Sequence, residues 1–239
     1  MNTRELFDLG GKTAVVTGGS IGLGNQIAWG LAEAGVNLVL CARKKERCDA
    51  LAEEIRRETG VRVHSLGCDV SREEEVERLA RESLAAFGAI DILINNAGIS
   101  WAARPEEMSA VDWQKVLDVN LNGTFFACKH FGRAMITRRS GCIVNLSSIM
   151  AIKAERVMSA PSYSVSKGAV ITLTRDLAVQ WGRYKIRVNA VAPGWFPSHM
   201  TEDVIAKFGD EMLARVPMGR FGGINDLKGV IVFLASAAA

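Results

Sequence analysis

Residues 13–24 read Thr13-Ala14-Val15-Val16-Thr17-Gly18-Gly19-Ser20-Ile21-Gly22-Leu23-Gly24, an apolar run followed by spaced glycines. The apolar and β-branched residues predict a buried strand, and the glycines allow a sharp turn into a helix. We expect that helix to begin near Gly22 and to end before Gly35, a typical C-terminal cap. Because backbone amides at a helix start attract a pyrophosphate, the segment predicts a dinucleotide site at Gly18, Ser20, Ile21, Gly22 and Gly24.

The glycine spacing is Gly18-xxx-Gly22-x-Gly24, which differs from the GxGxxG spacing of the general dinucleotide fingerprint. A tight turn between strand and helix that binds nothing is therefore the alternative interpretation. The place of the turn, directly after the first strand of an alternating chain, favours the ligand-binding interpretation.

Strand-like and helical patterns alternate along the rest of the chain. Further strands are expected at Val36–Leu40, Val61–Leu66, Ile90–Ile94, Cys142–Leu146 and Ile186–Val191. Helical patterns lie at Lys44–Glu58, 112–138 and 161–183, and Ser71 is the expected N-cap of another helix. Apolar strands between helices indicate a parallel sheet covered on both faces. We therefore expect an α/β protein with one doubly wound Rossmann-type domain, residues 1–239.

Composition excludes several classes of protein. The formal net charge of +3 is too small for a nucleic-acid-binding face, and no apolar run reaches the length of a membrane span. Five cysteines form no CxxC pair and no secretory leader precedes Lys12, so reduced thiols in a cytoplasmic protein are expected. The three histidines lack metal-ligand spacing, so no metal site is expected.

The end of the second strand carries information about the cofactor. An acidic residue there would accept hydrogen bonds from a ribose 2′-hydroxyl, whereas a basic residue would pair with a 2′-phosphate. This chain has no acid at the strand end and continues with Arg43 and Lys44. Because guanidinium groups bind phosphate well, the sequence predicts NADP(H) in preference to NAD(H). The alternative is that Arg43 is simply a solvated residue at a helix start.

Tyr163 and Lys167 stand four residues apart, so a helix places them on one face. A phenol has a pKa near 10, and a neighbouring ammonium, together with an oxidised nicotinamide, is expected to lower it into the range useful for acid–base catalysis. Ser148 ends the fifth strand, at the edge of a parallel sheet where ligands bind. A plain helical Tyr–Lys pair and a capping serine are the alternatives.

Together these motifs resemble the short-chain dehydrogenase/reductase family, in its "classical" subgroup. The resemblance rests on the order of Thr17–Gly24, Asp69-Val70, Asn95–Gly98, Asn120, Ser148, Tyr163-xxx-Lys167 and Pro193-Gly194, and it runs from about Lys12 to Ala235. It implies an oxidoreductase that moves a hydride between NADP(H) and a carbonyl or secondary alcohol. It also implies that Tyr163 is the general acid/base, that Ser148 positions the substrate oxygen, that Lys167 binds the nicotinamide ribose and that Asn120 holds a water in the proton relay.

The resemblance assigns further cofactor contacts. Asp69 and Val70 correspond to contacts with the adenine ring, although Asp69 also fits a turn or cap. The remaining residues border the cofactor along the central sheet and at the nicotinamide end: Asn96, Ala97, Gly98, Pro193, Gly194 and Ser198. For Asn96, Gly98 and Asn120 a structural role is the alternative or an addition.

Two features depart from the family pattern. The chain stops at Ala239, where relatives continue into a last strand, so we expect six strands and a missing edge strand. Fifteen positions separate Ser148 from Tyr163, slightly more than is usual, which predicts a longer loop at Lys153–Pro161 beside the pocket.

The substrate is left open by the sequence. An apolar lining for a ketone or acyl chain would come from Met158, Trp195, Phe196 and Met200, whereas a polar sugar acid would meet Lys153, Glu155 and Arg156. Within the family, 3-oxoacyl thioester reductases and gluconate-type or polyol dehydrogenases that use NAD are the alternatives; outside it, a catalytically silent cofactor-binding sensor or scaffold. The resemblance further implies a homotetramer or dimer packed through the helices at 112–138 and 161–183, whose apolar residues are Leu121, Phe125, Phe126, Val170, Leu173 and Leu177.

Overall fold

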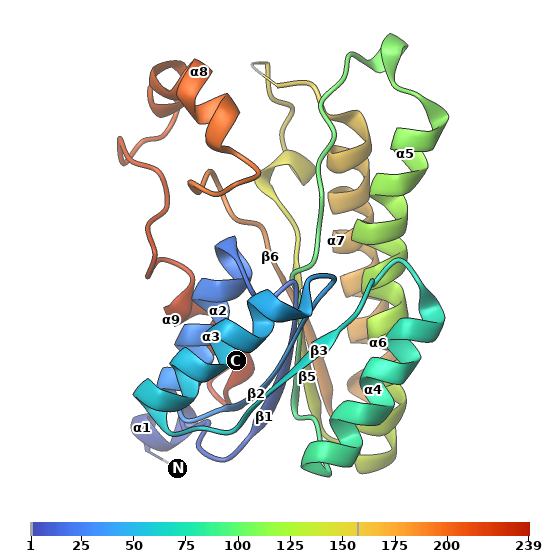
Figure 1. The fold of residues 1–239 in the computed structure, drawn as a ribbon, viewed down its shortest axis with the longest axis vertical. Helices are drawn as coiled ribbons and strands as arrows, with labels where there is room; N and C mark the ends of the chain where they lie inside the picture. Colours follow the sequence, from blue (N-terminus) through green and yellow to red (C-terminus); the bar gives the residue numbers. More distant parts are fainter. Residues whose placement is uncertain (1, 157) are drawn as a thin grey trace.

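A computed structural model describes residues 2–156 and 158–239, and a parallel sheet of six strands forms the centre of that part of the chain (Figure 1). The strands lie in the order β3-β2-β1-β4-β5-β6. Their bounds are β1 Thr13–Thr17, β2 Asn37–Ala42, β3 Val63–Gly67, β4 Ile92–Asn95, β5 Gly141–Leu146 and β6 Ile186–Val191. Helices connect them at α1 Thr3–Leu6, α2 Gly22–Glu33, α3 Lys45–Thr59, α4 Glu73–Phe87, α5 Ala110–Leu117, α6 Gly123–Arg138, α7 Pro161–Gly182, α8 Glu202–Leu213 and α9 Lys228–Ala235.

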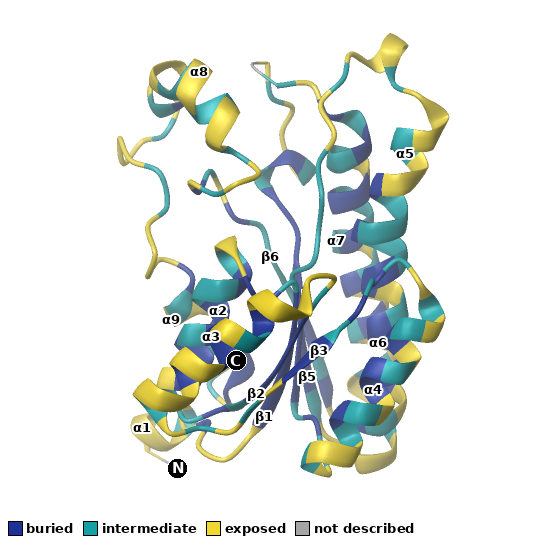
Figure 2. Cartoon of the chain, viewed as in Figure 1, coloured by how far each residue is buried: buried dark blue, intermediate teal, exposed yellow. Residues whose placement is uncertain are grey.

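Helices cover both faces of the sheet. The helices α2, α3 and α9 pack on one face, and α4, α6 and α7 pack on the other (Figure 1). Alternate residues of each strand supply the two apolar cores: Ala14 and Val16 of β1 face α2 and α3, whereas Val15 faces the opposite layer. Figure 2 shows the buried residues concentrated in the strands and on the helix faces that meet them. This two-sided burial explains why the central strands β1 and β4 are buried along their whole length, whereas the outer strands β3 and β6 also carry polar residues.

The strand order reverses direction between β1 and β4. From β1 the chain builds outward through β2 and β3, and it then crosses back to place β4 on the other side of β1. In doubly wound sheets the loops after these two central strands diverge, which opens a crevice at their carboxyl ends. The glycine turn follows β1, and Asn96 to Gly98 follow β4, so both predicted cofactor segments border this crevice.

The prediction of a doubly wound parallel sheet with six strands is confirmed for the described residues, with strand ends shifted by up to two residues. The helix predicted at 112–138 is present as α5 and α6, which a short π-helical segment, Asp118–Asn122, joins into one path. The helix predicted at 161–183 is α7. The helices α1, α8 and α9 were not predicted.

The prediction that Ser71 caps a helix is wrong. Helix α4 begins at Glu73, and its N-cap is Arg72, whose side chain makes no capping hydrogen bond. The Ser71 amide and hydroxyl instead donate to Asp69 Oδ1, at 3.0 and 2.7 Å. An ionised carboxylate is a stronger acceptor than a serine hydroxyl, so the turn that Asp69 organises takes precedence over the cap.

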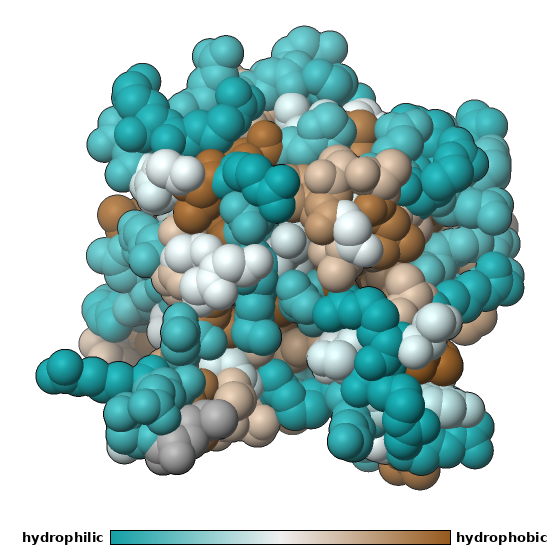
Figure 3. Space-filling model, turned by 90° about the horizontal axis from the view of Figure 1, so that it is seen from below, coloured by the Kyte–Doolittle hydropathy of each residue, from teal (hydrophilic) through white to brown (hydrophobic). Residues whose placement is uncertain are grey.

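Two further observations bear on class. In the described part of the chain, no helix has both the length and the apolar character needed to cross a membrane. All five cysteines are free and buried. Figure 3 shows the end of the molecule opposite α8, where hydrophilic residues dominate and hydrophobic residues gather only in small groups.

Candidate active site

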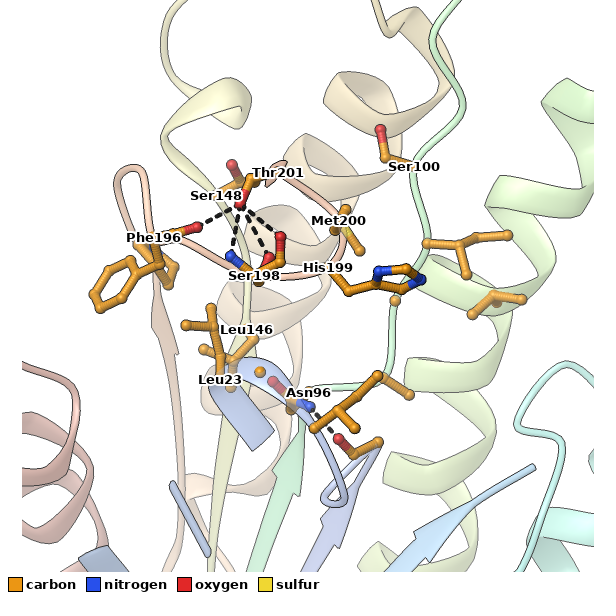
Figure 4. Close-up of a pocket in the computed structure, with 18 of the residues that line it drawn as sticks. Leu23, Asn96, Ser100, Leu146, Ser148, Phe196, Ser198, His199, Met200 and Thr201 are labelled. Atoms are coloured by element: carbon orange, nitrogen blue, oxygen red, sulfur yellow. Dashed lines mark hydrogen bonds between the residues drawn. The ribbon is translucent and has the colours of Figure 1, made fainter. Parts of the chain in front are cut away.

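A cavity of about 750 Å³ lies at the carboxyl ends of the strands. Its walls come from the glycine turn, the starts of α2 and α3, the loops after β3, β4, β5 and β6, and the first turns of α7 (Figure 4). Nearly all predicted site residues line it: Gly18, Ser20, Ile21, Gly22, Arg43, Lys44, Asp69, Val70, Asn96, Ala97, Gly98, Ser148, Tyr163, Lys167, Pro193, Gly194 and Ser198. Gly24 and Asn120 are the two predicted site residues that do not line it.

The glycine turn has a backbone that other residues would strain. Gly18 and Gly22 have φ values of +63° and +57°, in the left-handed region. A Cβ on Gly18 would also lie 2.9 Å from the Cα of Ala97. Gly24 is needed for another reason, because a Cβ there would overlap the Gly18 carbonyl oxygen. Gly24 therefore lets α2 approach the turn, and it shapes the cavity without touching it.

Hydrogen bonds lock the end of β4 against this turn. The Thr17 hydroxyl accepts from the amides of Asn96 and Ala97, both at 3.1 Å. The Asn96 side chain donates to the carbonyls of Thr17 and Gly18, at 2.9 and 3.0 Å. Both the main-chain and the side-chain amide of Asn96 are thus hydrogen-bonded to the glycine turn, and these bonds tie the end of β4 to the end of β1.

Three cations line the end of the cavity near β2. Arg43, Lys44 and Arg47 are exposed, and no ion pair engages them among the described residues. Arg47 was not predicted; it lies in the first turn of α3, close in sequence to Arg43 and Lys44. Three unpaired cations at one end of a cavity suit a phosphate group.

Asp69 shapes the opposite wall of this end. Its carboxylate accepts from Ser71, and its amide donates to the Glu75 carboxylate at 2.9 Å. Asp69 therefore has the turn role considered as an alternative, and it also lines the cavity beside Cys68 and Val70.

Asn120 is fully buried in the π-helical segment and fixes the loop after β4. Its side chain accepts from the Ile99 amide at 2.8 Å and donates to the Ile99 carbonyl at 2.9 Å. It also donates to the Ser166 hydroxyl at 3.0 Å, and that hydroxyl donates to the Tyr163 carbonyl at 2.7 Å. The side-chain amide therefore connects the cavity loop with the turn of α7 that carries Tyr163.

Ser147 and Ser148 have different surroundings. The Ser147 hydroxyl donates to the Lys167 carbonyl at 2.9 Å, which ties the end of β5 to α7. The Ser148 hydroxyl accepts from the Met150 amide at 3.1 Å. It also faces the Tyr163 hydroxyl, whose pKa it lowers through a side-chain hydrogen bond.

Burial governs the pKa values of Tyr163 and Lys167. Loss of water raises the pKa of Tyr163 above its usual 10.0, against the smaller opposite effect of Ser148. Burial lowers the pKa of Lys167 from 10.5 to about 8. The Lys167 ammonium donates to the Leu146 carbonyl at 2.7 Å and lies 5.8 Å from the centre of the Tyr163 ring. In the protein alone, burial thus outweighs the lowering of the Tyr163 pKa that was expected from Lys167.

Comparison with known proteins places this site in a family. A model of the short chain dehydrogenases matches residues 12–208. Gluconate 5-dehydrogenase of Gluconobacter oxydans is 39% identical over all of this chain and 93% of its own length. A 3-oxoacyl-(acyl-carrier-protein) reductase of Aquifex aeolicus is 36% identical over 97% of this chain and 92% of its own.

The chain belongs to the short-chain dehydrogenase/reductase family.

A solved structure in this family agrees closely. The gluconate 5-dehydrogenase of Burkholderia cenocepacia, in complex with NADP and tartrate, has a TM-score of 0.94 and 37% identity, over 99% of this chain and 92% of that one. This short-chain dehydrogenase is accordingly an NAD(P)-dependent oxidoreductase.

The cavity fits a dinucleotide. Glycines at Gly18 and Gly22 leave the floor of the turn free of side chains, beside the amide groups at the start of α2. A cation cluster lies at one end, and Tyr163 and Lys167 lie further along the same cavity. A phosphate-bearing ligand can therefore span it.

The other end of the cavity is mainly apolar. The residues predicted to line an apolar pocket for a ketone or acyl chain all line the cavity: Met158, Trp195, Phe196 and Met200. Lys153, Glu155 and Arg156 of the longer loop do not line it. The cavity is also lined by residues that were not predicted: Leu23, Ala42, Arg47, Cys68, Ile99, Ser100, Val119, Leu146, Ser147, Ile149, Met150, His199 and Thr201.

Proposed function

We propose that this short-chain dehydrogenase transfers hydride between NADP(H) and a carbonyl or secondary alcohol, with Tyr163 as the general acid/base. The observation that carries the proposal is the Ser148–Tyr163 hydroxyl pair, which faces the same cavity as the glycine turn and Lys167. When bound, the nicotinamide supplies or accepts the hydride.

The chain's own residues bind, orient and move a proton. The Ser148 hydroxyl donates to the substrate oxygen and fixes its position beside the Tyr163 hydroxyl. Tyr163 then donates its proton to that oxygen in reduction and removes it in oxidation. Its raised pKa keeps the phenol protonated at neutral pH, which suits the acid role.

Lys167 and Asn120 support this proton transfer. Lys167 donates to the Leu146 carbonyl, and we propose that it binds the nicotinamide ribose. The positive charge of a bound oxidised nicotinamide would favour the phenolate form of Tyr163. The side-chain amide of Asn120 is committed to Ile99 and Ser166, so its proposed hold on a relay water falls to the main-chain carbonyl. That carbonyl already accepts from the Thr124 hydroxyl at 2.8 Å and keeps a second lone pair.

NADP(H) is the proposed cofactor in preference to NAD(H). Support comes from the exposed cations Arg43, Lys44 and Arg47, which line the adenosine end of the cavity. A carboxylate that could take a 2′-hydroxyl is lacking from the end of β2.

We further propose that residues 1–239 act as one catalytic domain in a cytoplasmic homotetramer or dimer. Of the six apolar residues considered for subunit contact, Phe125 is exposed, Val170 and Leu177 are core residues, and the other three are half-buried. Val179 on α7 is 78% exposed and adds to the candidate surface. A sedimentation mass equal to one 25.9 kDa chain would contradict the oligomer.

The central experiment titrates the purified protein with NADPH and NADH separately and then follows cofactor absorbance with a panel of carbonyl compounds. Tight NADPH binding and its oxidation by one carbonyl class support the proposal. A preference for NADH contradicts the assignment of Arg43, and binding without any turnover favours a sensor or scaffold.

A further inference from the structure

The charges around the cavity are distributed unevenly. Arg43, Lys44 and Arg47 all lie at the adenosine end, and Lys167 lies at the catalytic centre. At the far end, beyond Ser148 and Tyr163, no Lys, Arg, Asp or Glu is among the described residues that line the cavity. A carboxylate or phosphate on the substrate would therefore meet no fixed cation there.

Several charged residues of the surrounding loops pair with one another outside the cavity, and Arg156, which forms no ion pair within the described residues, is exposed and does not line it. The Glu155 side chain is only 3% exposed and accepts from Arg215 at 2.8 Å. Arg215 also donates to Glu211 at 2.6 Å. These pairs engage Glu155, Arg215 and Glu211 with one another, and none of the three lines the cavity.

The remaining polar groups at the far end are mostly neutral and already bonded. The Thr201 hydroxyl accepts from the Ser198 amide at 2.9 Å and donates to the Phe196 carbonyl at 2.6 Å. His199 pairs with Glu202 at 2.7 Å, so even a protonated imidazole there belongs to a pair without net charge. Figure 4 shows Ser100 and His199 across the cavity from Phe196.

Apolar side chains supply the rest of the surface. They come from the two connections that follow β5 and β6: Met150, Met158, Trp195, Phe196 and Met200. Phe196 is held firmly, since its ring packs so closely on Gly222 that a Cβ there would overlap it. Methionines around a fixed aromatic ring suit apolar groups of variable shape.

The geometry points to an uncharged ketone, or the matching secondary alcohol, whose apolar arm fills the far end of the cavity. A sugar acid, the kind of compound that several relatives are named for, would bring an anion into a region that offers it no partner. This inference rests on the proposed function and specifies its substrate class.

The test compares two compounds with the same carbonyl group, 5-oxohexanoate and its methyl ester, in NADPH oxidation. We expect kcat/KM for the ester to exceed that for the free acid by about a hundredfold, because the acid loses hydration without gaining a partner. Along a series of methyl ketones from 2-butanone to 2-octanone, KM should fall by up to about fourfold per methylene until the far end is full.

A charge placed in the far end should reverse the discrimination. Met158→Lys is expected to raise kcat/KM for the free acid at least about tenfold while leaving the Kd of NADPH unchanged. Ile152→Lys is the matched control, since Ile152 lies on the same loop, is 73% exposed and does not line the cavity. Its discrimination should equal that of the unaltered protein.

The outcomes separate this inference from the proposed function. Equal or better use of the free acid, or an equal effect of Ile152→Lys, overturns the substrate class while the oxidoreductase proposal stands. Failure of every ketone and ester to oxidise NADPH overturns both.

Discussion

Glu155 and Arg215 form an ion pair between segments sixty positions apart in the chain, the loop before α7 and the end of α8. The loop before α7 also carries Met158, which lines the cavity, and Thr201 at the start of α8 lines it as well. The pair is asymmetric, because the Glu155 side chain is 3% exposed and that of Arg215 is 41% exposed. The enclosed carboxylate therefore depends on Arg215 for compensation.

This asymmetry predicts different costs for single and double variants. Arg215→Met leaves a buried carboxylate without its main partner and should lower the free energy of unfolding by about 1–2 kcal/mol, discounted for the exposure of Arg215. The double variant Glu155→Gln/Arg215→Met should recover most of this loss, as measured by urea denaturation. Arg57→Met, which breaks an exposed pair with Glu58, is the control with a near-zero effect. Equal losses in single and double variants would show that the pair is uncoupled.

Tyr163→Phe removes the proposed acid/base hydroxyl and keeps the ring. We expect kcat to fall by about a thousandfold or more, with the Kd of NADPH and the melting temperature little changed. The second tyrosine of the chain provides the control, because Tyr184→Phe should leave kcat unchanged. Activity near the unaltered level in Tyr163→Phe would refute the assignment.

Lys167 predicts a pH dependence of stability. Its folded-state pKa of about 8 lies below its ordinary value of 10.5, so between these values the unfolded chain binds more protons than the folded one. Stability contributed at this position therefore rises with pH across that interval. Compared with Lys167→Met, the unaltered protein should gain on the order of 2 kcal/mol from pH 8 to about pH 10 in urea denaturation. Unfolding free energies that change with pH in the same way in both proteins would contradict a lowered pKa for Lys167.

The cation cluster predicts selective loss of NADPH. Replacing Arg43 and Arg47 together by alanine should raise the Kd of NADPH by about a hundredfold, because two charge-assisted contacts to the 2′-phosphate are lost. The Kd of NADH should change by less than about twofold. Arg57→Ala on the same helix, 72% exposed and outside the cavity, is the matched control. Equal weakening of both cofactors would place the arginines elsewhere than at the 2′-phosphate.

Gly24 tests the packing of the glycine turn. Gly24→Ala places a Cβ against the Gly18 carbonyl, where neither backbone can move freely, and should cost about 3 kcal/mol in unfolding free energy. Gly229→Ala in α9 meets no atom within 4 Å and should be neutral or slightly stabilising. Comparable stability of both variants would mean that α2 can retreat from the turn.

The central strands could be predicted because a covered parallel sheet demands continuous apolar runs, and the runs at residues 13–16 and 92–94 are short and apolar and lead into loop residues. The cavity residues followed from the order of the motifs and from the rule that ligands bind at the carboxyl ends of strands. Both depend on local sequence. Features that depend on distant partners were less accessible.

Three features show what local sequence lacks. Ser71 was predicted as a cap because it precedes a helix, but the carboxylate of Asp69 competes for it. Asn120 lies in the π-helical segment, and its side chain makes tertiary hydrogen bonds with Ile99 and Ser166. The hydrophobic periodicity of the sequence does not predict these bonds. The pKa of Tyr163 depends on how much water the folded loops exclude. The spacing of residues within one helix carries no information about that exclusion.

The hydrogen bonds between Thr17 and Asn96 join positions 79 residues apart. The closed form of the glycine turn is therefore a long-range contact that arises only after β4 has docked beside β1. A nascent chain released up to residue 91 carries the glycine turn without the strand that closes it. Cofactor affinity should therefore depend on docking of β4 beside β1, and a bound dinucleotide should slow proteolysis that requires these two strands to separate.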